Sequence, residues 1–300
     1  MRTPMPLVSV GMPAFNAERW IGAALESILQ QTLTNFELII SDNASLDGTL
    51  SICRDYAKKD SRIIIISNPI NQGASENYNL VYRKARAPYF KWASSNDYCH
   101  AHLLQRCTEL LERRADAVLA YPKTMLYQQN PADGEPCDDD LDLDVACATT
   151  RFRRFIERIR LNNLMNGVFR TAALGNTALI RPYLASDVVL MAEVLLRGPF
   201  VEVPEYLFFR SMNPDTATKL KSRRETVEHL DPAAGGRMLF QPWREQCAYF
   251  RAVAMAPLSP AQKLDLFSYL ARGVIVARQH FWNDVVFSMR CLMSARRLDG

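Results

Sequence analysis

The sequence lacks the paired cysteines that mark zinc sites and disulfide frameworks. Its seven cysteines are an odd number, and no two of them form a Cys-x-x-Cys pair. Structural zinc sites and disulfide-stapled domains depend on such pairs, so neither is indicated. Reduced thiols are typical of the cytoplasm, which is the location that we expect.

Long hydrophobic runs and a strong charge of one sign are also missing. No stretch reaches the roughly 18 apolar residues that a membrane-spanning helix needs. The apolar segment near the N-terminus is short and broken by prolines, unlike a signal peptide. The net charge of +4 is too small to indicate nucleic-acid binding by itself. It is compatible with anionic small substrates or an anionic membrane surface.

What the sequence does have is enough apolar material for a large core. Of its 300 residues 48% are hydrophobic, which predicts one large domain or one domain with an extension. In the first 122 residues, short apolar runs alternate with segments of helical spacing. The expected strands are 7–12, 36–41, 62–67, 89–94 and 117–122, and the expected helices are 17–31, 47–59, 74–86 and 102–114.

This alternation predicts an α/β fold with a parallel sheet that is covered by helices on both faces. Each of the first four strands ends in a polar turn, namely "PAFNAE", "SDNASLD", "SNPINQG" and "SSND". The carboxyl ends of parallel strands share one edge of the sheet, where ligands bind. We therefore expect the four turns to face one crevice.

After residue 122 the alternation lapses. Residues 128–144 read as an acidic loop and residues 151–165 as a basic helix. Residues 185–198 are expected to form another helix, and residues 200–212 a pair of strands. From residue 241 onward the pattern is helical.

The four turns carry groups suited to a nucleotide diphosphate. Asp42 and Asn43 can accept from a base or from ribose hydroxyls. Gly73 precedes a helix whose free N–H groups favour phosphate. Asp97 follows a buried strand, and one carboxylate can hold a divalent cation when phosphates and waters complete its shell.

Together these pieces resemble glycosyltransferase family 2, whose members have the GT-A fold. The matching segments are "VSVGMPAFNAERWIGAALESILQQT", "FELIISDNASLDGT", "NQGASENYN" and "YFKWASSND", within residues 7–98, and more weakly "SDVVLMAEVLLRGPFVEVPEYLFFR". The resemblance implies a Rossmann-like, mostly parallel sheet flanked by helices, with a helical C-terminal extension. It also implies a domain division into a catalytic domain over 1–215, with a nucleotide-sugar half (1–122) and an acceptor-side half (123–215), and an extension over 216–300.

The activity implied is metal-dependent transfer of a sugar, with inversion, from a nucleotide-diphosphate sugar to an acceptor hydroxyl in glycan or polysaccharide assembly. The resemblance makes Asp97 the last residue of a DxD motif that binds Mn2+ or Mg2+, and Asp187 the general base, with Glu193 as its fallback. Ser95 and Asn96 replace the acids usual in that motif. The residues expected to bind the nucleotide sugar are Pro13, Ala14, Phe15, Asn16, Glu18, Asp42, Asn43, Asn71, Gly73, Asn77, Ser95 and Asn96.

Simpler roles remain open for several of these residues. Asp42 is also suited to an Asx-turn, and Asp187 to capping the helix that it begins. For Asp47, just before a helix, we favour capping. His100 and His102 follow the metal candidate but are more typical of surface or cap positions.

Two alternatives concern the whole protein and its C-terminal segment. The altered "SSND" motif is compatible with a binding or scaffold protein of the same fold. The C-terminal helices are interpreted either as packing on the catalytic domain or on a second subunit, or as lying on the inner face of a membrane that carries a lipid-linked acceptor. Because their apolar residues cover more than one stripe, the sequence favours packing.

Overall fold

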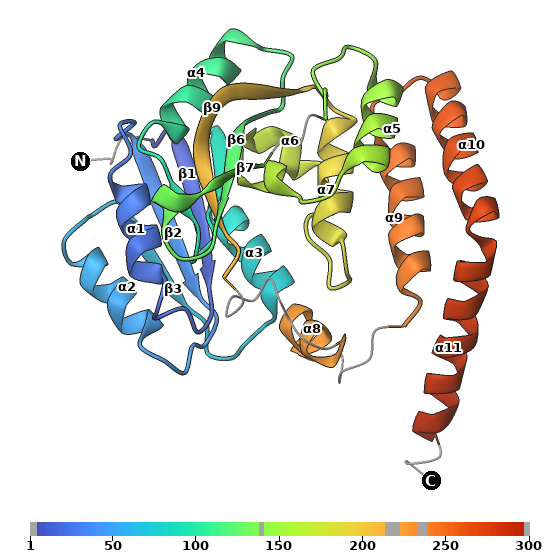
Figure 1. Cartoon of the computed structure of the whole chain (residues 1–300), viewed down its shortest axis with the longest axis horizontal. Helices are drawn as coiled ribbons and strands as arrows, with labels where there is room; N and C mark the ends of the chain where they lie inside the picture. Colours follow the sequence, from blue (N-terminus) through green and yellow to red (C-terminus); the bar gives the residue numbers. More distant parts are fainter. Residues whose placement is uncertain (1–4, 138–140, 214–222, 233–238, 297–300) are drawn as a thin grey trace.

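A single mixed sheet forms the centre of the molecule, and a long helical pair stands at one side of it (Figure 1). This computed structural model describes residues 5–137, 141–213, 223–232 and 239–296. The strands are β1 (Val8–Ala14), β2 (Phe36–Asp42), β3 (Ile63–Ser67), β4 (Tyr89–Trp92), β5 (Tyr98–Cys99), β6 (Leu119–Tyr127), β7 (Glu135–Cys137), β8 (Val168–Arg170) and β9 (Phe200–Ser211).

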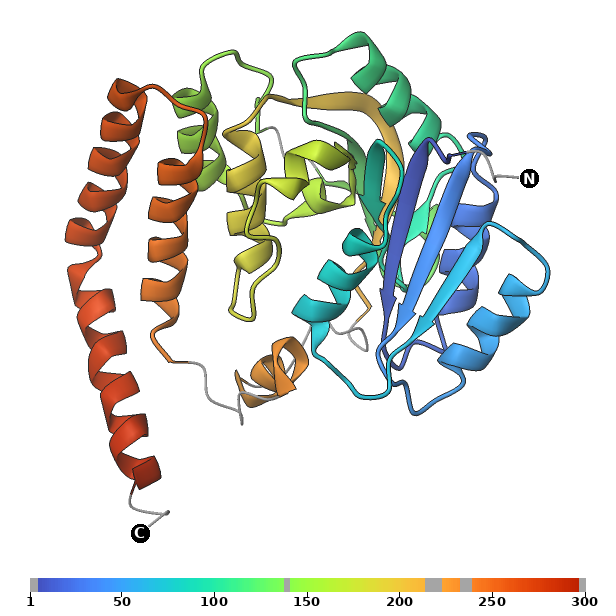
Figure 2. The same cartoon turned by 180° about the vertical axis from the view of Figure 1, so that it is seen from behind.

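Helices cover both faces of this sheet. The helices of the described residues are α1 (Ile21–Leu29), α2 (Thr49–Ala57), α3 (Ala74–Arg83), α4 (Leu103–Arg113), α5 (Ala148–Arg158), α6 (Thr171–Gly175), α7 (Ser186–Leu195), α8 (Arg223–Leu230), α9 (Gln241–Met255), α10 (Pro260–Val276) and α11 (Arg278–Arg296), with short 3-10 helices at Pro131–Asp133 and Asn163–Asn166. One apolar core lies under α1, α2 and α4. The other lies under α3, α5, α6, α7, α9 and α10 (Figure 2).

The N-terminal half of the sheet is parallel, as the alternation predicts. The strand order is β3-β2-β1-β4-β8-β6-β9-β5, with β7 paired to β6. Strands β1 and β2 are buried along their whole length, which is why both are apolar runs rather than alternating ones. Strand β1 continues through Pro13 to Ala14, two residues beyond the predicted end. The turns after these strands therefore share one edge.

The other half of the sheet is mixed. Strand β8 runs antiparallel to both β4 and β6, while β9 runs parallel to β6 and antiparallel to β5. The two-strand prediction for residues 200–212 is wrong, because they form one long strand. The register of β9 against β6 shifts between Val203 and Tyr206, so an irregularity accommodates Pro204, which has no N–H to donate.

The acidic loop and the basic helix also differ from the prediction. The loop contains strand β7, and helix α5 ends at Arg158 instead of continuing to residue 165. Asp138–Asp140 lie outside the described residues, but Asp142 pairs with Arg154 of α5 and Asp144 pairs with Arg114. One arginine of the basic helix thus binds the acidic loop.

The C-terminal helices are joined to the helices that cover the sheet. Helix α9 packs against α7, and α10 packs against α9 and α5. Tyr249, Leu266 and Leu270 belong to the same apolar cluster as Trp92 of the central sheet. The predicted boundary at residues 215 and 216 lies outside the described residues, and the division into two domains stays a prediction. Within the described residues, no helix is both long enough and apolar enough to cross a bilayer.

Helices α10 and α11 form one nearly continuous rod, which we call the C-terminal rod (Figures 1 and 2). Bonds of the α-helical type bridge their junction, because Ala277 N–H donates to Gly273 and Phe281 N–H donates to Ala277. Ser259 and Gln262 form a capping box at the start of α10.

Candidate active site

A cavity of about 560 Å3 opens beside the carboxyl ends of the parallel strands. Its walls come from α3, the turn after β4, the segment 160–166, the start of α7 and helix α8. The polar side chains that line it are Ser75, Tyr78, Ser94, Asn96, Asp97, Arg160, Asn162, Asn166, Tyr183, Ser186, Asp187, Arg210, Thr226 and His229. The chain therefore gathers groups that are more than 100 positions apart around one space.

Asp97 lies in the wall of this cavity, at the end of the turn that joins β4 to β5. Its Oδ1 accepts a hydrogen bond of 2.8 Å from the backbone N–H of Ser211, at the end of β9. Burial raises the pKa of this carboxyl to about 6, although the Ser211 bond and the positive charges of Arg210 and Lys91 act in the opposite direction. The nearby hydrogen bond and positive charges therefore offset only part of the cost of burying the Asp97 carboxylate.

Asp187 faces the same cavity from the first turn of α7. Its Oδ2 accepts a 2.9 Å hydrogen bond from the side-chain amide of Asn162. The side chain of Tyr78 lies near both carboxylates: burial raises its pKa to about 12, and the negative charges of Asp97 and Asp187 contribute. The structure thus brings the predicted metal ligand and the predicted base together.

Glu193, the fallback base, lies elsewhere. It is 5% exposed, and its Oε2 accepts a 2.6 Å hydrogen bond from the backbone N–H of Ala178. Burial raises its pKa. Since Glu193 does not line the cavity, the geometry favours Asp187 as the base.

Four asparagines tie the turns after β2 and β3 together. Asn43 donates to Asn71 Oδ1 and to the carbonyl of Gly73, and its own oxygen accepts from Gln72 N–H and Asn68. Asn77 donates to the carbonyls of Ser41 and Ala14. Asn43 and Asn77, which were predicted to bind the nucleotide sugar, are buried here together with Asn68, and in this structure all three act as internal supports for the turns.

Asp42 is closed off from the cavity in this structure. It is 1% exposed, and its Oδ2 accepts from Ser45 N–H at 3.3 Å, as an Asx-turn residue would. Its Oδ1 is buried without a hydrogen-bond partner. An unpartnered buried oxygen is costly, so it is well suited to a donor group supplied by a ligand.

The turn after β1 is fastened to the turn after β2. Asn16 binds Ser45 and Leu46, and Glu18 accepts a 2.5 Å hydrogen bond from the backbone N–H of Gly48. Asp47 accepts from the backbone N–H and hydroxyl of Thr49, the first residue of α2, so the predicted capping role fits. Pro13 and Ala14 are buried, whereas Phe15 is 37% exposed.

Gly73 permits a close contact between the turn after β3 and helix α8. Its φ is +83°, in the region that favours glycine, and a Cβ there would lie 2.4 Å from the carbonyl oxygen of Leu230. Helix α8 can therefore close one side of the cavity only if position 73 has no side chain.

The sequence analysis did not predict several of the residues that line the cavity. Arg160, Arg210 and His229 add basic groups, and burial lowers the pKa of His229. Arg210 Nη1 also donates to Asn163 at 2.8 Å. Arg210 stands in a segment that resembles the family, but Arg160 and His229 belong to segments without a recognisable motif.

The residues around Asp97 fit a cation that arrives with a diphosphate. Within the cavity they supply the Asp97 carboxylate and the neutral oxygen of Asn96. Ser95, the third residue of the predicted motif, does not line the cavity. In the described part of the chain, no three His, Cys, Asp or Glu side chains cluster as a metal site. His102 contacts Thr32, and neither it nor His100 lines the cavity. Ligand oxygens and waters would have to complete the coordination.

Comparison with known proteins agrees with the fold described above. The model of the family "Glycosyl transferase family 2" matches residues 9–181. The chain is 36% identical over 109 residues to the uncharacterized glycosyltransferase EpsJ of Bacillus subtilis (strain 168), covering 36% of this chain and 31% of EpsJ. It is 40% identical over 94 residues to WfaP of Escherichia coli, a UDP-Glc:alpha-D-GlcNAc-diphosphoundecaprenol beta-1,3-glucosyltransferase, covering 31% of this chain and 37% of WfaP.

The fold also matches a solved structure. The crystal structure of S. aureus TarS 1-349 in complex with UDP-GlcNAc aligns with a TM-score of 0.65 at 17% identity, covering 85% of this chain and 69% of TarS 1-349. This likeness supports the expected GT-A fold. The chain spans about a third of the length of the two curated relatives described above.

Proposed function

The chain belongs to glycosyltransferase family 2, and from this premise we propose that it transfers a sugar, with inversion, from a nucleotide-diphosphate sugar to an acceptor hydroxyl. One observation carries the proposal. Asp97 and Asp187, from turns that are 90 positions apart in the sequence, line one cavity beside the strand ends. A base and a diphosphate site must lie close together for a single displacement.

In this proposal Asp187 is the general base. The acceptor oxygen attacks the anomeric carbon while the bond from that carbon to the diphosphate breaks, and the acceptor proton passes to the Asp187 carboxylate. Asn162 holds Oδ2 of Asp187, which leaves Oδ1 for the acceptor. Arg160 and Arg210 lie in the same cavity, where their charges would favour the departing diphosphate.

We also propose that Mn2+ or Mg2+ binds with the donor. Asp97 would be its main protein ligand, and Asn96 would be available to hydrogen-bond a water in its shell. When bound, the cation would stabilise the negative charge of the leaving diphosphate. We propose that the unpartnered oxygen of Asp42 accepts a hydrogen bond from the nucleobase of the donor, which requires the turn after β2 to open because Asp42 is buried in this structure.

The proposed acceptor is a glycan or a lipid-linked saccharide in bacterial polysaccharide assembly. This follows from the partial similarity to WfaP, whose name gives a diphosphoundecaprenol-linked acceptor. The competing proposal is a binding protein of the same fold. It is supported by Ser95 and Asn96, which replace the acids usual in the DxD motif. The presence of both Asp97 and Asp187 in one cavity favours the enzyme.

The test is release of free nucleoside diphosphate. A panel of nucleotide sugars is first screened for thermal stabilisation of the protein with Mn2+, Mg2+ or EDTA. The donor that stabilises is then incubated with candidate acceptors, and nucleoside diphosphate is measured. An enzyme releases it faster with a suitable acceptor, and the Asp187→Asn variant does not. Binding without release in either protein would support the binding-protein alternative.

A further inference from the structure

The C-terminal rod has two apolar stripes, and only one of them is covered by the rest of the protein. In α10, Leu266 and Leu270 are buried, and in α11, Phe281 and Ser288 are buried. These residues are separated by 4, 11 and 7 positions, which is close to whole turns of an α-helix. They therefore form one side of the rod, the side that faces α9.

The second stripe points away from the protein. Its members are large apolar residues with exposed fractions of 68%, 62%, 64%, 48% and 57%: Leu264, Ile275, Trp282, Met289 and Met293. They are separated by 11, 7, 7 and 4 positions, so they also share one side of the rod. Leu264 is two positions from Leu266, about 200° around the helix, and Trp282 is one position from Phe281, about 100°, so the outer stripe lies on a different side of the rod from the buried one.

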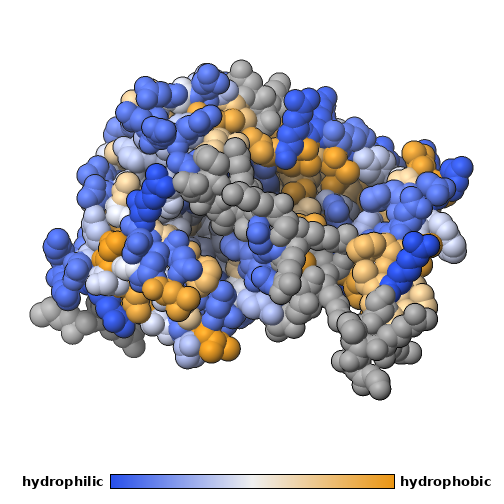
Figure 3. All heavy atoms as spheres, turned by 60° about the horizontal axis from the view of Figure 1, so that its bottom comes forward, coloured by the Kyte–Doolittle hydropathy of each residue, from blue (hydrophilic) through white to orange (hydrophobic). Residues whose placement is uncertain are grey.

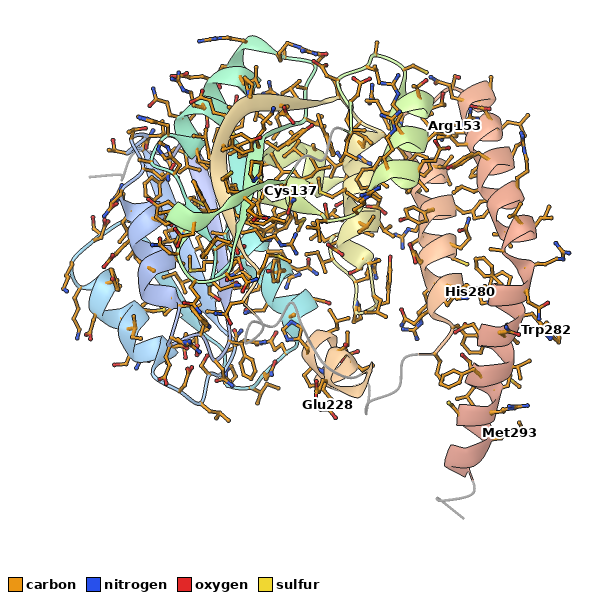
Figure 4. All side chains as sticks on the ribbon, in the orientation of Figure 1. Cys137, Arg153, Glu228, His280, Trp282 and Met293 are labelled. Carbon is orange, nitrogen blue, oxygen red and sulfur yellow. The ribbon has the colours of Figure 1, made fainter. Side chains whose placement is uncertain are left out.

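The figures show the same arrangement. Trp282 lies at the outer edge of α11, on the side away from α9, and Met293 lies nearer the end of that helix (Figure 4). In the space-filling view, hydrophobic side chains on the rod stand beside strongly hydrophilic ones (Figure 3). From Leu264 to Met293 the outer stripe is roughly 44 Å long.

The charges beside the outer stripe are positive. Arg272, Arg278 and Arg290 are exposed on the rod. Of the two carboxylates in α10 and α11, Asp265 is paired with Arg153 at 2.6 Å, and Asp284 is only partly exposed. A second copy docked along this stripe would bring its own arginines toward these, whereas an anionic lipid surface would complement them.

We propose that the outer stripe of the C-terminal rod is a docking surface for an anionic phospholipid bilayer. The rod lies along the bilayer, with Trp282 and the methionines in the interface and the arginines at the lipid headgroups. The sequence favoured packing because the apolar residues form more than one stripe. In the structure one stripe packs on α9, and the other is left for the membrane. This proposal does not depend on the proposed reaction.

The first experiment is flotation of the full chain with vesicles. We expect it to float with vesicles of phosphatidylcholine and phosphatidylglycerol at low salt. With phosphatidylcholine alone, or at high salt, binding should fall at least about tenfold, because screening weakens the arginine contacts. Met293→Glu should lower binding by a similar factor. Met5→Glu is the matched control, since Met5 is 69% exposed and lies outside the rod, and it should float as the wild type does.

A second measurement reports on one side chain. The chain has four tryptophans. If Trp282 enters the lipid interface, anionic vesicles should shift the emission to shorter wavelength. Trp282→Phe should remove most of that shift but keep flotation, because phenylalanine is also apolar.

Two results would overturn the proposal. One is a wild-type protein that stays unbound with anionic vesicles at low salt. The other is a Met293→Glu variant, folded by circular dichroism, that floats as well as the wild type. If sedimentation velocity also showed a dimer that Met293→Glu dissociates, the outer stripe would be an interface between two copies.

Discussion

The candidate active-site cavity and the C-terminal rod depart in opposite directions from the usual division between an apolar interior and a polar surface. In the cavity, burial raises the pKa of the Asp97 carboxyl to about 6. On the rod, Trp282 is 64% exposed and Ile275 is 62% exposed. Both arrangements are unfavourable for the isolated chain. A cation would relieve the first and a lipid surface the second, so each departure indicates a different kind of partner.

Asp97→Asn should have the largest effect. It removes the charge proposed to hold the donor's cation, and we expect kcat/KM to fall roughly 10³-fold, as for loss of a central electrostatic group. Initial rates of nucleoside diphosphate release measure this. Asp116→Asn is the matched control, because Asp116 is an exposed carboxylate paired with Arg114. If Asp97→Asn kept full turnover, Asp97 would not be a ligand of the cation.

The same substitution should stabilise the fold at neutral pH. The folded pKa of Asp97 is raised from 3.8 to about 6, so the carboxylate opposes folding above pH 6, and this penalty fades as the pH falls toward 3.8. The full shift corresponds to about 3 kcal/mol, and because the Asp97 side chain is only partly buried in the cavity wall, we expect about 1–2 kcal/mol of it. We expect Asp97→Asn to raise the Tm by a few degrees at pH 7.5 and by less at pH 5.

Asp187→Asn should rank next. Loss of the base should lower kcat roughly 10²–10⁴-fold while donor affinity is retained. Glu193→Gln provides the contrast, because Glu193 is bound to Ala178 N–H outside the cavity. It should affect thermal stability more than turnover. The opposite pattern, with turnover lost only in Glu193→Gln, would move the base to that residue.

Asp42→Ala should weaken nucleotide binding. If the unpartnered oxygen of Asp42 accepts from the nucleobase, its removal costs roughly 1.5–3 kcal/mol, or about 10- to 150-fold in Kd. Isothermal titration with the free nucleoside diphosphate measures this. Unchanged affinity in a variant of normal stability would mean that Asp42 only forms the turn with Ser45.

The activity should also fall when the pH is lowered below 6. Because protonation of Asp97 removes the charge that the cation needs, kcat/KM should fall about tenfold for each pH unit below 6. Asp97→Asn should flatten this limb. A wild-type profile that stays level from pH 7 to pH 5 would show that this ionisation does not control the reaction.

The smallest effect is expected on the outer side of the rod. Ile275→Ser should change the free energy of unfolding by less than about 0.5 kcal/mol, because the side chain is largely exposed. Leu270→Ala, on the buried side of the same helix, should cost about 2–4 kcal/mol. Urea unfolding without lipid compares them. Equal losses would mean that both sides are covered in solution.

The sequence predicted the parallel half of the sheet because apolar runs and helical spacing are local features. The four turns were expected to face one crevice, but only the turn after β4 lines the cavity, while the turns after β1, β2 and β3 bind one another. Apolar runs alternate with helical spacing, and strand ends place Asp42 and Asp97 without knowledge of the rest of the fold. Asp187 was placed by resemblance alone. The single strand β9 was missed because Pro204 reads as a break, although an irregular register accommodates it.

Other parts of the site depend on contacts between distant segments. Arg160 and His229 reach the cavity only through the packing of the segment after α5 and of α8. The burial of Asp42 and the closed asparagine network likewise follow from how the turns pack. On the rod, periodicity indicated that the apolar residues cover more than one stripe, but only tertiary structure shows which side α9 covers.

The hydrogen bond from Ser211 to Asp97 has a consequence for the order of assembly. It joins residues 114 positions apart, so it cannot form on a ribosome until β9 has emerged. Before then, β1–β4 can pair with one another while the Asp97 carboxylate remains in water at its ordinary pKa. The Asp97 carboxylate is then desolvated only when β9 docks, which makes that late folding step less favourable. Refolding should therefore show a slow phase that speeds up in acid, when the carboxyl is neutral, and that Asp97→Asn makes insensitive to pH.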